Sequence, residues 1–280
     1  MSRITPFQTL ACPLDGAPLR RDGATWRCAS GHSFDVAADG HVHLLPVQFK
    51  RSRDPGDSKP MVAARRRFLE SGAYAPIADA VAGAVFASAA PDRPLACLDA
   101  GCGEGHYLRR LADAAGERPL ELLGLDISKW AVQAAARRDR RAAWVVGTNA
   151  RLPVLSGTLD RVLCLFGFPV YAEFARVLRP GGELLQVDAG PDHLRELREV
   201  IYPSLRPDRT SGPPAPEGFT LAACDTLRFG LHLDGAERIA DLLAMTPHLY
   251  RASAEGRSRA AALTAITLTA DVRLARYVRD

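Results

Sequence analysis

The sequence lacks several features that define large classes of proteins. No run of residues approaches the ~18 uncharged apolar positions of a membrane-spanning helix. The opening residues MSRITPFQTL lack the basic-then-apolar order of a signal peptide. Six cysteines spread over 280 residues are too few for a disulfide framework, and a reducing compartment would keep them as thiols or metal ligands. We therefore expect a cytoplasmic protein without a membrane partner, long enough for one main domain and a small appendage.

The chain also lacks a strong overall charge, since its net charge is only +4. Composition alone therefore does not require a nucleic-acid partner. The charge is instead concentrated between Phe49 and Arg67, a segment with a net charge of +5. Its basic residues are Lys50, Arg51, Arg53, Lys59, Arg65, Arg66 and Arg67. An exposed loop of this composition suits phosphate binding, although an ordinary solvated loop has the same composition.

The most informative motif is the phrase CLDAGCGEGHY. An apolar run ends in Asp99, and Gly101, Gly103 and Gly105 follow at alternate positions. Glycines at this density indicate a turn with positive φ angles or a ligand lying against the main chain. A second apolar run, LLGLD, ends in Asp126 at the distance expected for a carboxylate that binds a ribose diol. The motif lacks the G-x-G-x-x-G order of dinucleotide sites, so it favours S-adenosylmethionine, which has a ribose and a sulfonium but no phosphate.

Strands and helices alternate through the middle of the chain. Apolar runs predict strands over 95–99, 120–125, 143–146, 161–165 and 183–188, with helices over 61–69, 74–86, 106–115, 129–138 and 171–178. This order is typical of a mostly parallel sheet covered by helices on both faces. Ligands in such sheets bind beyond the carboxyl ends of the strands, where the glycine turn, Asp126 and the 147–152 loop all fall.

The remaining parts of the chain carry weaker signals. RPGG at 179–182 predicts a turn between a helix and a strand. The proline-rich stretch 203–216 predicts a flexible insertion. Segments 221–233 and 261–277 suit antiparallel strands that close the edge of the sheet.

The first 45 residues form short apolar pieces that are too small to fold on their own without a metal or a neighbour. They contain Cys12, Cys28 and His32 in the order C-x15-C-x3-H. Where a C-x-x-C knuckle would place a second cysteine, the chain has Asp15, whose carboxylate is a harder and less favoured zinc ligand than a thiolate. Two interpretations stay open: a weakened zinc site made of these four residues, or a module that has dispensed with metal.

Several phrases together resemble the bacterial 23S ribosomal RNA guanine-N1 methyltransferases. The longest is LLPVQFKRSRDPGDS, which follows the cysteine-containing module and precedes MVAARRRFLESGAYAP. Further phrases are GCGEGHY, LDISKWAVQAAAR, RLP, ARVLRPGG and GPDHLREL, so the resemblance covers essentially the whole chain. The basic phrase and the N-terminal module are the specific parts, since the glycine turn and RPGG are common among methyltransferases.

The resemblance implies a Rossmann-like class I methyltransferase fold, with a mostly parallel seven-stranded sheet and a small N-terminal zinc-ribbon-like module. It implies three parts: an RNA-recognition module at 1–45, a basic linker with lead-in helices at 46–90, and the methyltransferase domain at 91–280. S-adenosylmethionine would be bound by Tyr74, Gly103, Glu104 and His193, beside Asp126. The implied substrate is 23S rRNA, and a homodimer is a reasonable expectation.

Two departures bear on the expected activity. Asp15 stands where the family has a zinc cysteine, and LFGFP at 165–169 replaces a tyrosine-alanine-proline-cysteine phrase at the rim facing the substrate. No motif for adenine amino methylation is present, and the general base is not assigned between Asp188 and the 147–151 loop. A small-molecule methyltransferase that uses the N-terminal module as a lid and a non-catalytic RNA-binding protein stay open as alternatives.

Overall fold

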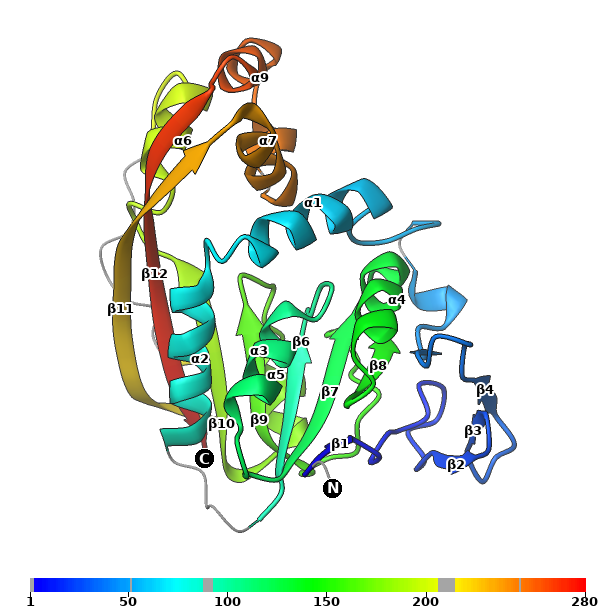
Figure 1. The fold of residues 1–280 in the computed structure, drawn as a ribbon. Helices are drawn as coiled ribbons and strands as arrows, with labels where there is room; N and C mark the ends of the chain where they lie inside the picture. The colour runs from blue at the N-terminus through cyan, green and yellow to red at the C-terminus, as the bar shows by residue number, and fades with distance from the viewer. Residues whose placement is uncertain (1–2, 51, 88–92, 206–214, 247) are drawn as a thin grey trace.

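The structure is a computed structural model that describes residues 3–50, 52–87, 93–205, 215–246 and 248–280. A nine-stranded sheet forms its centre, with the strand order β11-β12-β10-β9-β6-β7-β8-β5 and β1 paired to β7 (Figure 1). The parallel strands are β6 (Leu95–Ala100), β7 (Leu120–Asp126), β8 (Ala142–Val146), β9 (Leu159–Leu165) and β10 (Leu178–Ala189). These strands and the order in which they lie confirm the predicted methyltransferase sheet.

The central strands are apolar along their whole length because both faces of the sheet are covered. In β6, Leu95 and Cys97 pack into one core and Ala96 and Leu98 into the other. The first core receives α2 (Ala75–Ala87), α3 (His106–Ala114) and α4 (Lys129–Arg138). The second receives α5 (Tyr171–Val177) together with side chains of the N-terminal module, including Phe7. The module is therefore part of the main core.

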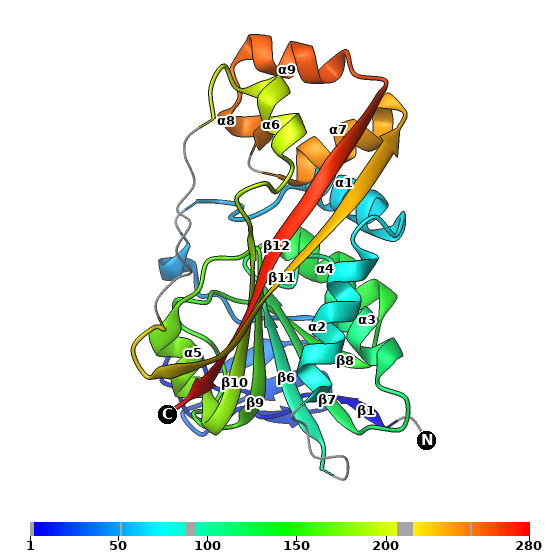
Figure 2. The ribbon, with the colours of Figure 1, turned by 90° about the vertical axis from the view of Figure 1, so that its left-hand side faces the viewer.

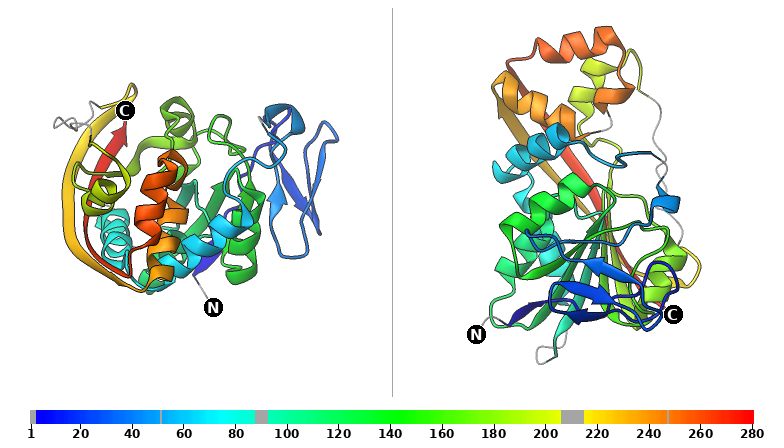
Figure 3. Two further views of the ribbon diagram at one scale, coloured as in Figure 1. Left: turned by 90° about the horizontal axis from the view of Figure 1, so that it is seen from above. Right: turned by 90° about the vertical axis from the view of Figure 1, so that its right-hand side faces the viewer.

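The N-terminal residues add two strands that the sequence does not predict. β1 (Ile4–Pro6) pairs with β7, and β5 (Val42–His43) extends the sheet beyond β8, so the sheet has nine strands where seven are expected. Between them, β2 (Arg20–Asp22), β3 (Thr25–Arg27) and β4 (Ser33–Asp35) form a separate antiparallel sheet. Figures 1 and 3 place this small sheet beyond the β8 end of the large one.

Two long antiparallel strands close the other edge. β11 (Phe219–Asp234) pairs with β12 (Ala265–Arg279), which in turn pairs with β10, as the sequence predicts. Both strands continue past the sheet and carry a helical cap, which Figure 2 shows at the top of the molecule. The cap contains α6 (Arg195–Ile201), α7 (Ala236–Met245), α8 (His248–Arg251) and α9 (Ala254–Ala261). The predicted insertion at 203–216 lies mostly outside the described residues.

RPGG adopts a different structure from the predicted turn. β10 begins at Leu178, directly after α5, and includes the phrase. The strand then shifts its register against β9 between Leu178 and Glu183, with Gly181 at a φ of 73°. The extra residues form an irregularity in the strand, which glycine allows because it adopts positive φ without strain.

Two short elements connect the N-terminal module to the sheet, the 3-10 helix η1 (Val47–Phe49) and α1 (Lys59–Glu70). Figure 1 shows α1 crossing above the carboxyl ends of the central strands, with α7 packed on its far side. Within the described residues, no helix is long and apolar enough to cross a membrane.

Candidate functional site

The glycine turn follows β6 at the end of the sheet that α1 covers. Gly101, Gly103 and Gly105 have φ angles of 109°, 56° and 82°, values that side-chain-bearing residues rarely adopt. A Cβ on Gly105 would also lie 2.5 Å from the Trp144 ring, so this glycine is required by packing as well as by backbone conformation. A Cβ on Gly103 would be 3.5 Å from Cδ of Arg65, which places the Arg65 side chain over the turn.

Asp126, the last residue of β7, fixes the shape of this turn. Its Oδ2 accepts a hydrogen bond from the Gly103 amide at 2.9 Å, and its Oδ1 accepts one from the Ser128 amide at 2.8 Å. Burial raises the pKa of this carboxyl, and the two amide donors oppose that rise. Each carboxylate oxygen has two lone pairs, so both retain acceptor capacity for the hydroxyls of a ribose. The strand-end position predicted from the sequence is confirmed, and the ribose contact stays a prediction.

Asp99 is the least satisfied polar group near the turn. It is buried at the end of β6, and neither of its carboxylate oxygens has a hydrogen-bond partner among the described residues. Burial, helped by the nearby charge of Asp126, raises the pKa of Asp99 to about 8. A buried carboxyl without partners is costly unless a ligand supplies donors or positive charge. The ammonium and sulfonium of S-adenosylmethionine offer both, so this carboxyl fits that cofactor.

Cofactor affinity should therefore rise with pH between 6 and 8. Below pH 8 the free protein holds Asp99 protonated, and a cationic ligand favours the ionised form, so binding must release a proton. We expect the association constant to increase by up to about tenfold per pH unit and close to one proton to be released at pH 7. Calorimetric titrations with S-adenosylmethionine in buffers of different ionisation enthalpy measure that proton. Asp99→Asn should remove the release, and a pH-independent affinity in the wild type would refute this role for Asp99.

Three aromatic side chains, Tyr74 before α2, Phe166 after β9 and His193, form a cluster. The Tyr74 hydroxyl lies 3.2 Å from Nε2 of His193, and the Tyr74 ring stacks against Phe166 with centroids 6.2 Å apart. The Asp271 amide donates to Nδ1 of His193, which assigns the proton of the neutral ring to Nε2. Burial lowers the pKa of His193 to about 4, so the imidazole is neutral at pH 7. The structure thus brings together two residues that the sequence places 119 positions apart.

Backbone strain marks the same cluster. The described residues contain two non-glycine positions with positive φ, Phe166 at 53° and Leu194 at 52°. Phe166 follows β9 directly, and Leu194 follows His193. Strained residues of this kind persist where the surrounding structure holds them in place, and they cluster at functional sites. Sequence analysis does not predict either strained position, because the left-handed conformation is not a preference of phenylalanine or leucine.

Glu104 lies in the turn, but its carboxylate faces the protein. The side chain is fully buried, and its Oε2 accepts a hydrogen bond from Nη2 of Arg109 at 2.8 Å. Burial raises the pKa of the carboxyl, and the Arg109 charge opposes that rise. The cofactor contact expected of Glu104 stays a prediction. The carboxylate has a structural role, since its hydrogen bond to Arg109 connects the glycine turn to α3.

Part of the basic phrase is docked on the turn between β7 and α4, which the sequence does not predict. Ser128 Oγ donates to the Asp57 carbonyl at 2.6 Å, and Nη2 of Arg65 donates to the Asp57 carboxylate at 2.7 Å. Gly56 has a φ of 81°, and a Cβ there would lie 2.9 Å from the Ser128 amide nitrogen. In the sequence, only the Gly56–Asp57 pair within DPGDS indicates a turn that could make this contact with Ser128. Arg65 and Asp57 therefore join the candidate site as a cover over the turn.

The four predicted metal ligands converge. One ligand atom each from Cys12, Asp15, Cys28 and His32 lies within 4.8 Å of all the others. Nδ1 of His32 lies 3.4 Å from either sulfur and 3.1 Å from Asp15 Oδ2. Tetrahedral zinc with bonds of about 2.0–2.3 Å sets its ligand atoms about 3.3–3.7 Å apart, close to these separations. The donor set and its geometry therefore fit zinc, with the Asp15 carboxylate as fourth ligand.

Replacing Asp15 with cysteine should strengthen zinc binding. A thiolate is the softer and preferred ligand for structural zinc, so we expect affinity to rise by at least about tenfold. Competition against a chromogenic chelator measures the change. Asp15→Ala is the matched control and should weaken binding, because it leaves three protein ligands. Unchanged zinc affinity in Asp15→Ala would mean that the carboxylate does not occupy a ligand position.

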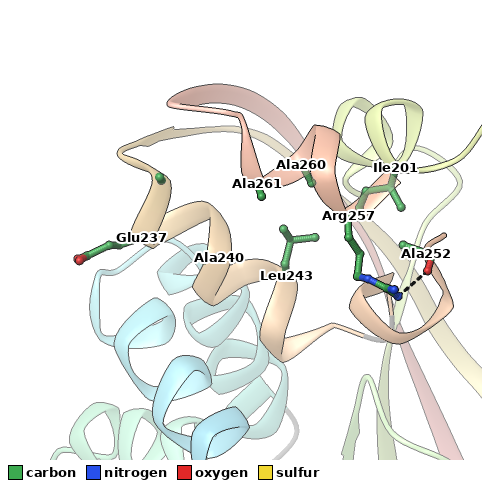
Figure 4. A pocket seen from close by; sticks show the side chains of 9 residues that line it. Ile201, Glu237, Ala240, Leu243, Ala252, Arg257, Ala260 and Ala261 are labelled. Carbon is green, nitrogen blue, oxygen red and sulfur yellow. Dashed lines mark hydrogen bonds between the residues drawn. The ribbon is translucent and has the colours of Figure 1, made fainter. Parts of the chain in front are cut away.

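A separate apolar cavity of about 500 Å³ lies in the helical cap. Figure 4 shows it between α7 and α9, with Ile201 of α6 at one side and the Arg257 guanidinium bonded to the Ala252 carbonyl. Five of its nine lining residues are alanine, and none belongs to the glycine turn or to the metal cluster. Glu237 supplies the one carboxylate of this lining, and Figure 4 shows it pointing away from the side chains of Leu243 and Ala261.

Comparisons with known proteins match both the N-terminal module and the sheet that carries the glycine turn. Residues 10–53 match the family described as "RlmA, N-terminal", and residues 97–182 match the family described as "Methyltransferase domain". A protein of Streptomyces fradiae named "23S rRNA (guanine(748)-N(1))-methyltransferase" is 38% identical over 242 residues, which is 85% of this chain and 84% of the relative. A Bacillus subtilis protein named provisionally as a 23S rRNA (guanine-N1) methyltransferase is 33% identical and covers 97% of this chain and 98% of its own.

Among solved structures, a protein of Bacillus halodurans described provisionally as a methyltransferase aligns with a TM-score of 0.45 and 16% identity, over 70% of this chain and 97% of that one. The long sequence matches, the N-terminal module and the glycine turn lead to one conclusion: the chain belongs to the family of 23S rRNA (guanine-N1) methyltransferases.

Proposed function

We propose that the protein transfers the methyl group of S-adenosylmethionine to N1 of a guanine in 23S rRNA. The observation that carries this proposal is the packing of a metal-binding module and a cofactor-type strand end on one sheet. A small-molecule enzyme does not need the module, and an RNA-binding protein does not need Asp99 and Asp126 at the strand ends. Membership of the family supports the same substrate.

The cofactor site in this proposal is the set predicted from the sequence, with a cover added by the structure. Asp126 takes the ribose, Asp99 faces the cationic groups, and the backbone of Gly101, Gly103, Glu104 and Gly105 lines the turn. Tyr74 and His193 border the methionine part through their shared hydrogen bond at 3.2 Å. When bound, S-adenosylmethionine supplies an electrophilic methyl group. Arg65 and Asp57 shield the turn from solvent.

Methylation at N1 of guanine requires removal of the proton that this nitrogen carries at neutral pH, so positioning and a general base both contribute. Asp188 lies at the end of β10, and its Oδ2 accepts a hydrogen bond from Gln186 Nε2 at 2.6 Å. Oδ1 is left to accept a proton. The alternative lies in the 147–151 loop, where Asn149 Oδ1 has no hydrogen-bond partner among the described residues and can orient the base edge. Asp188 is the better base because an amide oxygen does not take up a proton at neutral pH.

The substrate side of the proposal assigns stacking to the phenylalanines that follow β9. Phe166 is 37% exposed beside Tyr74, and Phe168 is 87% exposed. A guanine in a hairpin must leave the base stack to reach a methyl donor, and an exposed aromatic ring stabilises the extruded base.

The division of the chain into three parts, with boundaries at residues 45 and 90, is proposed with one qualification, since β1 and β5 of the N-terminal module join the main sheet. A cytoplasmic location follows from a ribosomal substrate, and the homodimer stays a prediction.

Methyl transfer to RNA at different salt concentrations tests the proposal against a small-molecule enzyme. Tritiated S-adenosylmethionine is incubated with the protein and 23S rRNA from a strain lacking the modification. We expect label in the rRNA, with an apparent KM that rises steeply with salt because phosphate contacts release counterions. Absence of label from the rRNA would refute RNA as the substrate, and a KM indifferent to salt would refute the phosphate contacts.

A further inference from the structure

Phe49 and Arg151 form an exposed aromatic–cation pair that no role proposed above uses. Phe49 ends η1 and is 39% exposed, and the guanidinium carbon of Arg151 lies 5.4 Å from the centre of its ring. Arg151 acts on Glu173 through its charge, but that carboxylate is already bonded to Arg176 and to the Leu152 amide. Within the part of the chain that the structure describes, the Arg151 side chain donates no hydrogen bond.

The pair is connected both to the metal module and to the cofactor site. Arg151 lines a cleft of about 290 Å³ together with Cys12, Pro13 and Gly16 of the metal module. The same loop reaches the cofactor end through Asn149, whose Nδ2 donates to the Ala100 carbonyl at 3.2 Å and to the Phe168 carbonyl at 3.4 Å. One loop thus joins Arg151, and through it Phe49, to the backbone of Phe168, whose ring is exposed.

Packing does not account for this exposure. Val47, in the same 3-10 helix, is 79% exposed, so η1 presents two large apolar side chains to solvent. An exposed aromatic ring is a platform for a base, and every base has a face that stacks on it. Arginine complements such a platform, because its planar guanidinium binds phosphate with two donors or stacks on a base. The combination fits one nucleotide with its phosphate better than it fits an uncharged ligand.

We propose that Phe49 and Arg151 bind an unpaired nucleotide adjacent to the methylated guanine, with its base stacked on Phe49 and its phosphate held by Arg151. The target guanine itself stacks at Phe168, beside the methyl donor. The inference rests on the proposed function, since it concerns the RNA that the enzyme methylates. Binding of the neighbouring nucleotide at the 147–151 loop would then determine which base reaches the methyl donor.

Kinetic measurements with a synthetic RNA hairpin test the role of Phe49 in this proposal. The hairpin carries the guanine that nucleoside mapping identifies in 23S rRNA. Phe49→Ala should raise KM for this RNA by about 5- to 150-fold, the range for loss of one base–aromatic stack, with kcat at saturating RNA and cofactor affinity unchanged. Phe49→Trp should keep KM within about threefold of wild type, since it retains a stacking ring. Val47→Ala is the matched control, an equally local loss of apolar surface, and should leave KM unchanged.

Abasic substitutions in the same hairpin identify the nucleotide. At one position next to the target, removal of the base should raise KM for the wild type, and that RNA should then be insensitive to Phe49→Ala. Arg151→Ala should raise KM and reduce the slope of log KM against log salt by about one. Unchanged KM in Phe49→Ala, or effects that add at every abasic position, would overturn the inference while leaving the enzyme's activity intact. Absence of methyl transfer by the wild type would overturn the proposed function itself.

Discussion

Asp126→Asn should weaken S-adenosylmethionine binding by about 100-fold or more. The carboxylate accepts from the Gly103 and Ser128 amides and is proposed to accept from both ribose hydroxyls. An asparagine amide nitrogen would face one of these N–H donors, which loses a hydrogen bond and sets two donors against each other. Hydrogen bonds to charged groups contribute about 1.5–3 kcal/mol each, so losing this bond and one of the proposed ribose contacts accounts for the expected change.

Isothermal titration with S-adenosylmethionine measures the effect directly. Glu121→Gln, near the opposite end of the same strand, is the matched control and should bind the cofactor as the wild type does. The thermal unfolding midpoint of both variants separates a binding defect from a folding defect. An Asp126→Asn protein that binds within about threefold of wild type would remove Asp126 from the cofactor site.

Cys28→Ser should remove zinc from the isolated protein and reduce rRNA methylation by about 100-fold or more. Structural zinc contributes about 10–16 kcal/mol to small metal-dependent modules, and Cys28 lies in the same core as Trp26 and Leu19. We expect the segments that carry the four ligands to lose their order, and the RNA contacts of the module to be lost with them. Cofactor affinity should stay within about threefold of wild type, because Asp126 and Asp99 lie on other elements.

Metal content by mass spectrometry, cofactor titration and rRNA methylation are measured on the same preparation. The matched control is Cys224→Ser, an exposed cysteine on β11 far from the cluster in sequence, which should retain zinc and activity. A wild-type protein that holds no zinc and still methylates rRNA would show that the module has dispensed with its metal. In that event the cluster geometry would be an inherited arrangement supported by hydrogen bonds alone.

Sequence reasoning succeeds where local chemistry determines the structure. The apolar runs of β6 to β9 are continuous because both faces of the sheet are buried, so the predicted strands agree with the observed ones within a few residues. The convergence of the glycine turn with Asp126 follows from the shared direction of parallel strands. The metal cluster follows from ligand type and spacing, which bring Asp15 to the position of the missing cysteine.

The elements that the sequence does not predict are those whose structure depends on long-range packing. β1 and β5 are two or three residues long, too short to carry a periodic pattern, and they form only because the main sheet offers free backbone groups. The helical cap is held by contacts among α6, α7 and α9 that no local signal reveals. Glu104 turns toward Arg109, and Asp57 docks on Ser128, through contacts between side chains and backbone that depend on the assembled fold.

The identity of the methylated nucleoside tests the central claim most directly. 23S rRNA from a strain lacking the modification is methylated by the wild-type protein, digested to nucleosides and analysed by mass spectrometry, with Asp126→Asn in parallel. We predict one new nucleoside, N1-methylguanosine, that is absent from the variant reaction. A different methylated nucleoside would contradict the proposed base, and no methylated nucleoside despite measurable cofactor binding would contradict rRNA as the substrate.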